Sequence, residues 1–123
     1  MRIAVTAQGA DLDSAMDPRF GRCRNFVIVD SDSDRFEAFS NESVMASGGA
    51  GTQSAQSLVN KGVDAVVTGN VGPNAARALE TAGIKVYVAT SGTVRDALQA
   101  YKEGRLSPVS GATVDSHHGM GRR

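Results

Sequence analysis

Apolar residues alternate with polar ones in the first half of the chain, which is the spacing of half-buried strands. Near the start, Ile3, Val5 and Ala7 share one face. A compact β-branched run follows a long polar loop, and a cluster of Ser and Asp then supplies turn residues before a second alternating stretch. The first half therefore predicts an antiparallel meander of three strands, over residues 2–7, 26–30 and 35–40.

The second half changes to helical spacing, with short buried strands between the helices. Gly62 and Gly83 stand at equivalent places, each closing a helix, because glycine takes the left-handed C-cap conformation most easily. Pro73 stands near the start of the second helix, where proline is tolerated. The predicted order is a helix over 52–62, a strand over 63–69, a helix over 72–83, a strand over 84–90 and a helix over 93–104.

Strands that alternate with helices indicate right-handed parallel crossovers, with helices on both faces of the sheet. Joined to the meander, they predict an α/β fold with a five-stranded mixed sheet in the order 3-2-1-4-5, strand 2 being antiparallel. This is ribonuclease-H-like topology. Residues 1–105 are expected to form a single domain. Residues 106–123 have few apolar anchors and several helix breakers, so we expect a loose or disordered tail.

Composition narrows the function classes. The 123 residues contain 13 Lys plus Arg and 13 Asp plus Glu, so no long-range field holds the protein to nucleic acid or to an anionic membrane. The apolar runs are far shorter than the roughly 20 residues that span a bilayer, and the N-terminus turns polar too early for a signal peptide. We expect a cytoplasmic protein. One cysteine excludes an intramolecular disulfide and a four-cysteine metal site.

Three arginines and the cysteine share the loop after the first strand, in the stretch DPRFGRCRNF at 17–26. This loop follows the C-terminal end of the first strand. In open α/β sheets, ligands bind beyond the C-terminal ends of the parallel strands. Arg19, Arg22 and Arg24 suit a phosphate, a carboxylate or an oxo or thio anion. Two interpretations stay open. The loop binds an anion, or it is solvated and its arginines pair with carboxylates, namely Asp11, Asp13 and Asp17.

Two glycine-rich stretches lead into helices, SGGAGTQSA at 47–55 and TGNVGPNA at 68–75. Glycines allow close approach of the backbone, and a helix N-terminus offers free N–H groups to an anion. The first stretch lacks the Gly-Lys-Ser/Thr end of a Walker A loop and the spacing of a dinucleotide fingerprint. A flexible connection with a helix cap, or an ordinary strand-to-helix turn, explains these residues equally well.

Candidate metal ligands are few. Cys23 stands between two arginines, which are expected to lower its pKa, although a lone cysteine is also typical of a packed core. His117, His118 and Met120 in the tail suit copper or zinc, or belong to a tail without a role. No Ser-His-Asp set or paired-carboxylate site is evident, and the first strand carries none of the carboxylates that a nuclease needs. We expect no enzyme.

The motifs MRIAVTA, DPRFGRC, GGAGTQSAQ and VDAVVTGNVGPNAARALETAGIKVY follow one another between residues 1 and 103. As an ordered set they resemble the small stand-alone members of the dinitrogenase iron-molybdenum cofactor biosynthesis domain family. The resemblance implies a ribonuclease-H-like fold and a non-catalytic carrier or assembly role for a metal-sulfur cluster. By motif position it implies a pocket of Arg19, Phe20, Gly21, Gly48, Gly49, Gly51, Gly69, Asn70 and Gly72, to which Arg22 adds charge and Met45, with Phe20, a hydrophobic lip.

With one cysteine in the chain, such a cluster has to arrive with its own sulfides and be held by charge, hydrogen bonds and enclosure. The resemblance implies a molybdenum-copper sulfide cluster or a related thiomolybdate species. The iron-molybdenum cofactor is less expected, because nitrogenase carriers of this family tend to use a histidine inside the domain, whereas both histidines here follow the last helix. The alternative is an interaction module that binds a small anion or nucleotide and docks on a partner ATPase. ATPases and cofactor-assembly proteins are the expected partners.

Overall fold

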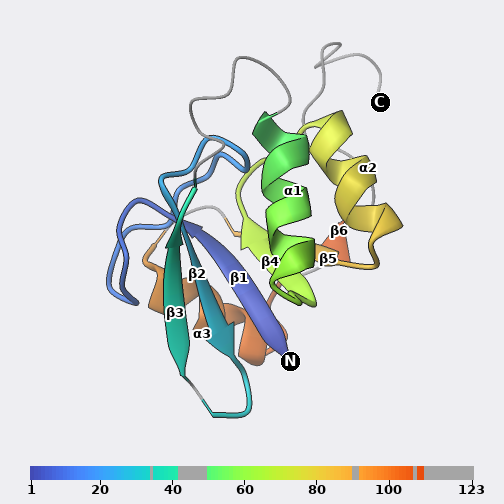
Figure 1. The fold of residues 1–123 in the computed structure, drawn as a ribbon. Helices are drawn as coiled ribbons and strands as arrows, with labels where there is room; N and C mark the ends of the chain where they lie inside the picture. Colours follow the sequence, from blue (N-terminus) through green and yellow to red (C-terminus); the bar gives the residue numbers. More distant parts are fainter. Residues whose placement is uncertain (34, 42–49, 90–91, 107, 110–123) are drawn as a thin grey trace, which may run out of the picture.

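The computed structural model describes residues 1–33, 35–41, 50–89, 92–106 and 108–109. Every predicted helix and strand is present, and its ends lie within a few residues of those expected (Figure 1). The elements are β1 (Arg2–Ala7), β2 (Asn25–Asp30), β3 (Phe36–Ser40), α1 (Ala50–Asn60), β4 (Ala65–Thr68), α2 (Pro73–Thr81), β5 (Lys85–Val88), α3 (Val94–Lys102) and β6 (Pro108–Val109).

The sheet has the order β3-β2-β1-β4-β5-β6. β2 is antiparallel to both β1 and β3, whereas β1, β4 and β5 are parallel to one another. The predicted order 3-2-1-4-5 with an antiparallel strand 2 is therefore confirmed, as is the α/β class.

The predicted number of strands is wrong, because the sheet has a sixth. Pro108 and Val109 pair antiparallel with Tyr87 and Val86 of β5, although they were expected in the tail. A strand of two residues is too short to show alternation, and proline is tolerated here because β6 lies at the edge of the sheet. Residues 110–123 of the predicted tail lie outside the described residues.

Alternation along the central strands divides the core into two layers. In β1, Ala4 packs beneath α1 and α2 together with Leu58 and Leu79. Ile3 and Val5 of the same strand face the other way and pack with Leu98 of α3. Figure 1 shows α1 and α2 in front of the sheet and α3 behind it, so both faces are covered as predicted.

The edge strand β3 is only partly covered. Phe39 packs against the α1 side, where the ammonium of Lys61 lies 4.4 Å from the centre of its ring. Phe36 pairs with Val29 and therefore faces the α3 side, where its side chain is 42% exposed. No helix in the described part of the chain is long and apolar enough to cross a membrane.

Candidate functional site

The loop after β1, residues 17–24, is called the arginine loop below, and it is bound to the turn that follows β4. The N–H of Asn70 donates to the carbonyl of Pro18 at 2.6 Å, and the N–H of Phe20 donates back to the carbonyl of Asn70 at 3.1 Å. Gly69 permits this contact, because a Cβ on it would lie 2.6 Å from the Cβ of Pro18 and 2.7 Å from its Cα. The two loops therefore meet, as predicted. Gly69 and Asn70 anchor the arginine loop and are not among the described residues that line the pocket next to it.

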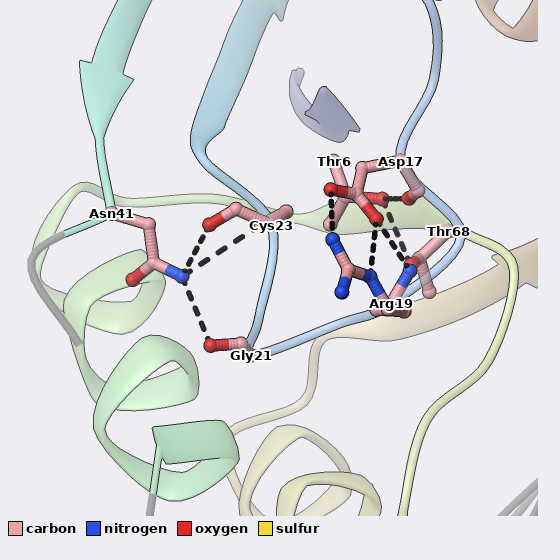
Figure 2. A network of polar contacts seen from close by, with 7 residues as sticks. All are labelled: Thr6, Asp17, Arg19, Gly21, Cys23, Asn41 and Thr68. Atoms are coloured by element: carbon pink, nitrogen blue, oxygen red, sulfur yellow. Dashed lines mark hydrogen bonds and ion pairs between the residues drawn. The ribbon is translucent and has the colours of Figure 1, made fainter. Parts of the chain in front are cut away.

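A buried carboxylate organises the start of the arginine loop. Asp17 is 1% exposed and accepts from the main-chain N–H of Arg19 at 3.0 Å and from its guanidinium at 3.2 and 3.3 Å (Figure 2). The hydroxyl of Thr6, at the end of β1, donates to the main-chain carbonyl of Asp17. Hydrogen bonding to Asp17, and then its charge, raise the pKa of Arg19. Arg19 therefore makes one of the predicted carboxylate pairs, with Asp17.

Another carboxylate that was predicted to pair with the loop arginines, Asp13, pairs with an arginine outside the loop. Asp13 pairs with Arg95 of α3 at 3.0 Å, and this contact lowers the pKa of Asp13. Arg22 and Arg24 are both exposed. Arg19 is exposed as well, so what distinguishes it among the three arginines of the loop is its pairing with Asp17.

A pocket of about 260 Å³ lies between the arginine loop and the first turns of α1 and α2. Five of the predicted site residues line it, and four more were missed because nothing in their types distinguishes them from ordinary helix starts. The lining consists of the predicted Phe20, Gly21, Arg22, Gly51 and Gly72 and the additional Thr52, Pro73, Asn74 and Ala75. Sequence motifs that are distant along the chain thus meet at one place.

The chemistry of this pocket favours an anion. Arg22 is the one charged residue among its described lining. Neither α1 nor α2 has an acidic residue in its first turn, and the N-cap of α2, Gly72, makes no side-chain capping bond. The first N–H groups of a helix have no partner within the helix and carry a partial positive charge. Phe20, whose ring packs 5.9 Å from that of Phe26, adds an apolar wall.

Cys23 belongs to the core. Its side chain is fully buried beside Phe20 and Phe26, on the side of the sheet that α1 and α2 cover. Burial, and then the charge of Asp17, raise the pKa of this thiol to about 12. The expected lowering by the neighbouring arginines is therefore wrong, because the thiol points into the protein and the guanidinium groups do not offset its desolvation. The packed interpretation is favoured over a reactive thiolate.

Several candidate residues lie outside the described part of the chain, namely Met45, Gly48, Gly49, His117, His118 and Met120. Within the described residues, no group of three or more His, Cys, Asp or Glu side chains is arranged to hold a metal ion. Sequence reasoning also missed Asn41, a buried amide between the arginine loop and α1. An Asn that follows a strand carries no signal that distinguishes it from a turn residue.

Comparison with known proteins matches this chain to one family over most of its length. The sequence model of a family described as dinitrogenase iron-molybdenum cofactor matches residues 1–104. A Methanocaldococcus jannaschii protein is 32% identical over 97 residues, which are 76% of this chain and 82% of the relative.

Two solved structures extend this relationship to three dimensions. The apo form of the orange protein from Desulfovibrio gigas has a TM-score of 0.88 and 43% identity, covering 91% of this chain and 95% of its own. The NMR structure of a NifB-like protein from Thermotoga has a TM-score of 0.81 and 41% identity, covering 91% and 96%.

Proposed function

Because the chain belongs to the dinitrogenase iron-molybdenum cofactor family, we propose that it is a non-catalytic carrier or assembly protein for a molybdenum-containing metal-sulfide cluster. The observation that carries the proposal is the pocket in which Arg22 and the first turns of α1 and α2 converge. The cluster is the protein's cargo. It is bound by charge, hydrogen bonds and enclosure, without a covalent bond to the chain.

The donor set of the pocket fits a preformed cluster better than a bare metal ion. Its described lining has no cysteine, histidine or carboxylate, the side chains that ligate metals in proteins. A cluster that brings its own sulfides needs N–H donors and positive charge around it. Arg22 and the helix N-termini are groups of this kind, and Phe20 suits the soft, weakly hydrated surface of a sulfide.

The favoured cargo is a molybdenum-copper sulfide cluster or a related thiomolybdate species. The family description supports molybdenum, and the 43% identity to the orange protein, solved in an apo form, supports a bound group. The iron-molybdenum cofactor is less favoured, because residues 1–104 contain no histidine to act as a ligand. The pocket residues that we assign to cargo are Arg22, Phe20, Gly21, Gly51 and Gly72, with Arg19, Gly69 and Asn70 supporting the loop. The resemblance also implies Met45, Gly48 and Gly49, which lie outside the described residues.

The proposed role is without catalysis, which is supported by a family description that names a cofactor and no reaction. Cofactor-assembly proteins are the partners that this role implies.

We also propose that the fold is ribonuclease-H-like, because the strand order is β3-β2-β1-β4-β5 with β2 antiparallel.

A small-anion or nucleotide-binding module that docks on a partner ATPase is the second candidate. It is favoured by the two helix N-termini, which attract phosphate as well as thiometallate.

The deciding experiment is metal analysis, with a visible spectrum, of protein purified anaerobically from its native host. We expect molybdenum, with copper and sulfide, in a fixed ratio to protein. In parallel, tetrathiomolybdate with Cu(I) is expected to raise the melting temperature of the apoprotein, whereas ATP and ADP leave it unchanged. Metal-free native protein that also fails to take up tetrathiomolybdate would contradict the proposal, and a shift with nucleotide alone would favour the second candidate.

A further inference from the structure

Asn41, the residue that follows β3, joins two walls of the pocket without being part of its lining. Its side chain is buried, with 6% exposed. Nδ2 donates to the carbonyl oxygens of Gly21 at 3.1 Å and Cys23 at 2.9 Å, and lies 3.8 Å from the sulfur of Cys23. Figure 2 shows the amide directed at this part of the arginine loop.

The opposite end of the same amide holds α1. Oδ1 of Asn41 accepts a hydrogen bond from the hydroxyl of Ser54 at 3.1 Å, and Ser54 is fully buried. Ser54 lies one turn after Gly51, which lines the pocket from α1, whereas Gly21 lines it from the arginine loop. One planar side chain therefore connects the two walls, and the main-chain N–H of Asn41 adds a bond to the carbonyl of Arg24 at 2.8 Å.

We propose that Asn41 is a positioning residue that holds the arginine loop against α1 and thereby sets the shape of the anion pocket. The identity of the ligand rests on the proposed function. The contact that holds the arginine loop against α1 does not depend on it. Asparagine suits this position because its amide donates two hydrogen bonds on one side and accepts on the other. A carboxylate of the same size, as in Asn41→Asp, turns an acceptor toward two carbonyl oxygens, which repel it.

The closure of the loop is measured without any ligand, through the single cysteine of the chain. Cys23 is fully buried, so a thiol reagent modifies it only when the protein opens around it, either locally at the arginine loop or by global unfolding. Under native conditions, we expect Asn41→Asp and Asn41→Ala to raise the modification rate by about tenfold or more. Ser54→Ala removes only the hydrogen bond from Ser54 to Oδ1 of Asn41 and is expected to raise the modification rate less. It is the substitute test if the Asn41 variants fail to fold.

Two control variants separate positioning from general stability. Asn60→Ala changes an exposed asparagine of α1, whose side chain accepts a hydrogen bond from Gln56 at 3.2 Å, and the rate is expected to stay at the wild-type value. Leu98→Ala weakens the core on the α3 side of the sheet. At a temperature where all variants are folded by circular dichroism, Leu98→Ala is expected to change the rate far less than Asn41→Asp.

The second readout is the affinity for tetrathiomolybdate, measured by titration at the same temperature. We expect Asn41→Asp to weaken binding about tenfold, which corresponds to about 1.4 kcal/mol, with Asn60→Ala and Leu98→Ala within about twofold of the wild type. Wild-type affinity in Asn41→Asp, or an unchanged rate of Cys23 modification, overturns the inference. If the wild-type protein binds no tetrathiomolybdate, the proposed cargo is wrong, and the rate of Cys23 modification alone decides whether Asn41 closes the loop.

Discussion

The guanidinium of Arg19 lies against the buried carboxylate of Asp17, with Nε 3.2 Å from Oδ1 and Nη2 3.3 Å from Oδ2. Because this carboxylate is 1% exposed and also accepts from the main-chain N–H of Arg19, the pair anchors the start of the arginine loop. Arg22, three residues further, lines the pocket. Arg19 is therefore tied to the loop, whereas Arg22 lies at the pocket, where the proposed function assigns it to a ligand.

Replacing Arg22 is expected to weaken ligand binding more than replacing Arg19. Arg22→Ala removes the one charged side chain among the described lining, so tetrathiomolybdate should bind about tenfold more weakly. Arg19→Ala is expected to weaken binding by a smaller factor, since Arg19 is not among the described lining and acts on the loop through Asp17. Titration of the folded variants measures both effects. Arg24→Ala is the control. If all three variants bind tetrathiomolybdate with wild-type affinity, the arginines are only surface charge.

Cys23→Ser is expected to retain the cargo. The thiol is buried in the core and its pKa is raised to about 12, so it is neutral at physiological pH and not available as a thiolate ligand. Metal content per protein, after reconstitution with tetrathiomolybdate and Cu(I), should match the wild type. Loss of metal from a variant that is still folded would show that the sulfur is a ligand.

The same pKa predicts a loss of stability in alkali. The thiol titrates near pH 9 in the unfolded chain and near pH 12 in the folded protein, so above pH 9 the unfolded state binds fewer protons and folding becomes less favourable. The free energy of unfolding should fall by up to about 1.4 kcal/mol per pH unit between about pH 9 and pH 12. Urea unfolding at about pH 7, 9 and 10 measures it.

Cys23→Ser is the control for this pH dependence, because it removes the titrating thiol. Burial also raises the pKa of Tyr101, which adds a fall in stability at higher pH in both proteins. The expected result is therefore a difference in slope, the variant being flatter between about pH 9 and pH 10. Parallel curves for the two proteins would argue that the thiol is not held in the desolvated core.

Two glycines of the loop after β4 are expected to respond differently to alanine. In Gly69→Ala the new methyl would lie 2.6 to 2.9 Å from the atoms of Pro18, including its backbone, so the arginine loop has to move. The expected cost is about 1–3 kcal/mol of unfolding free energy, with weaker ligand binding. Gly72→Ala places its methyl in open space, and its φ of −79° is ordinary, so stability should be nearly unchanged. Chemical denaturation measures both, and equal losses would contradict the close contact of Gly69 with Pro18.

The sequence by itself determined the elements and most of their order. Alternation with period two, helical spacing and the closing glycines Gly62 and Gly83 are local properties, so the amino-acid pattern alone places the helices and strands. The handedness of parallel crossovers then left one simple sheet order. β6 was missed because its pairing with β5 depends on where the chain returns after α3, and two residues carry no pattern of their own.

Motif order also indicated which loops form the pocket, and Phe20, Arg22 and Gly51 do meet there. Only the tertiary structure decided how individual side chains are used. It paired Arg19 with Asp17, buried the thiol of Cys23 and placed Asn41 between the arginine loop and α1. The physical reason is that burial and hydrogen-bond partners arise between residues brought together by folding, whereas sequence patterns report only on the face that each residue presents within its own helix or strand.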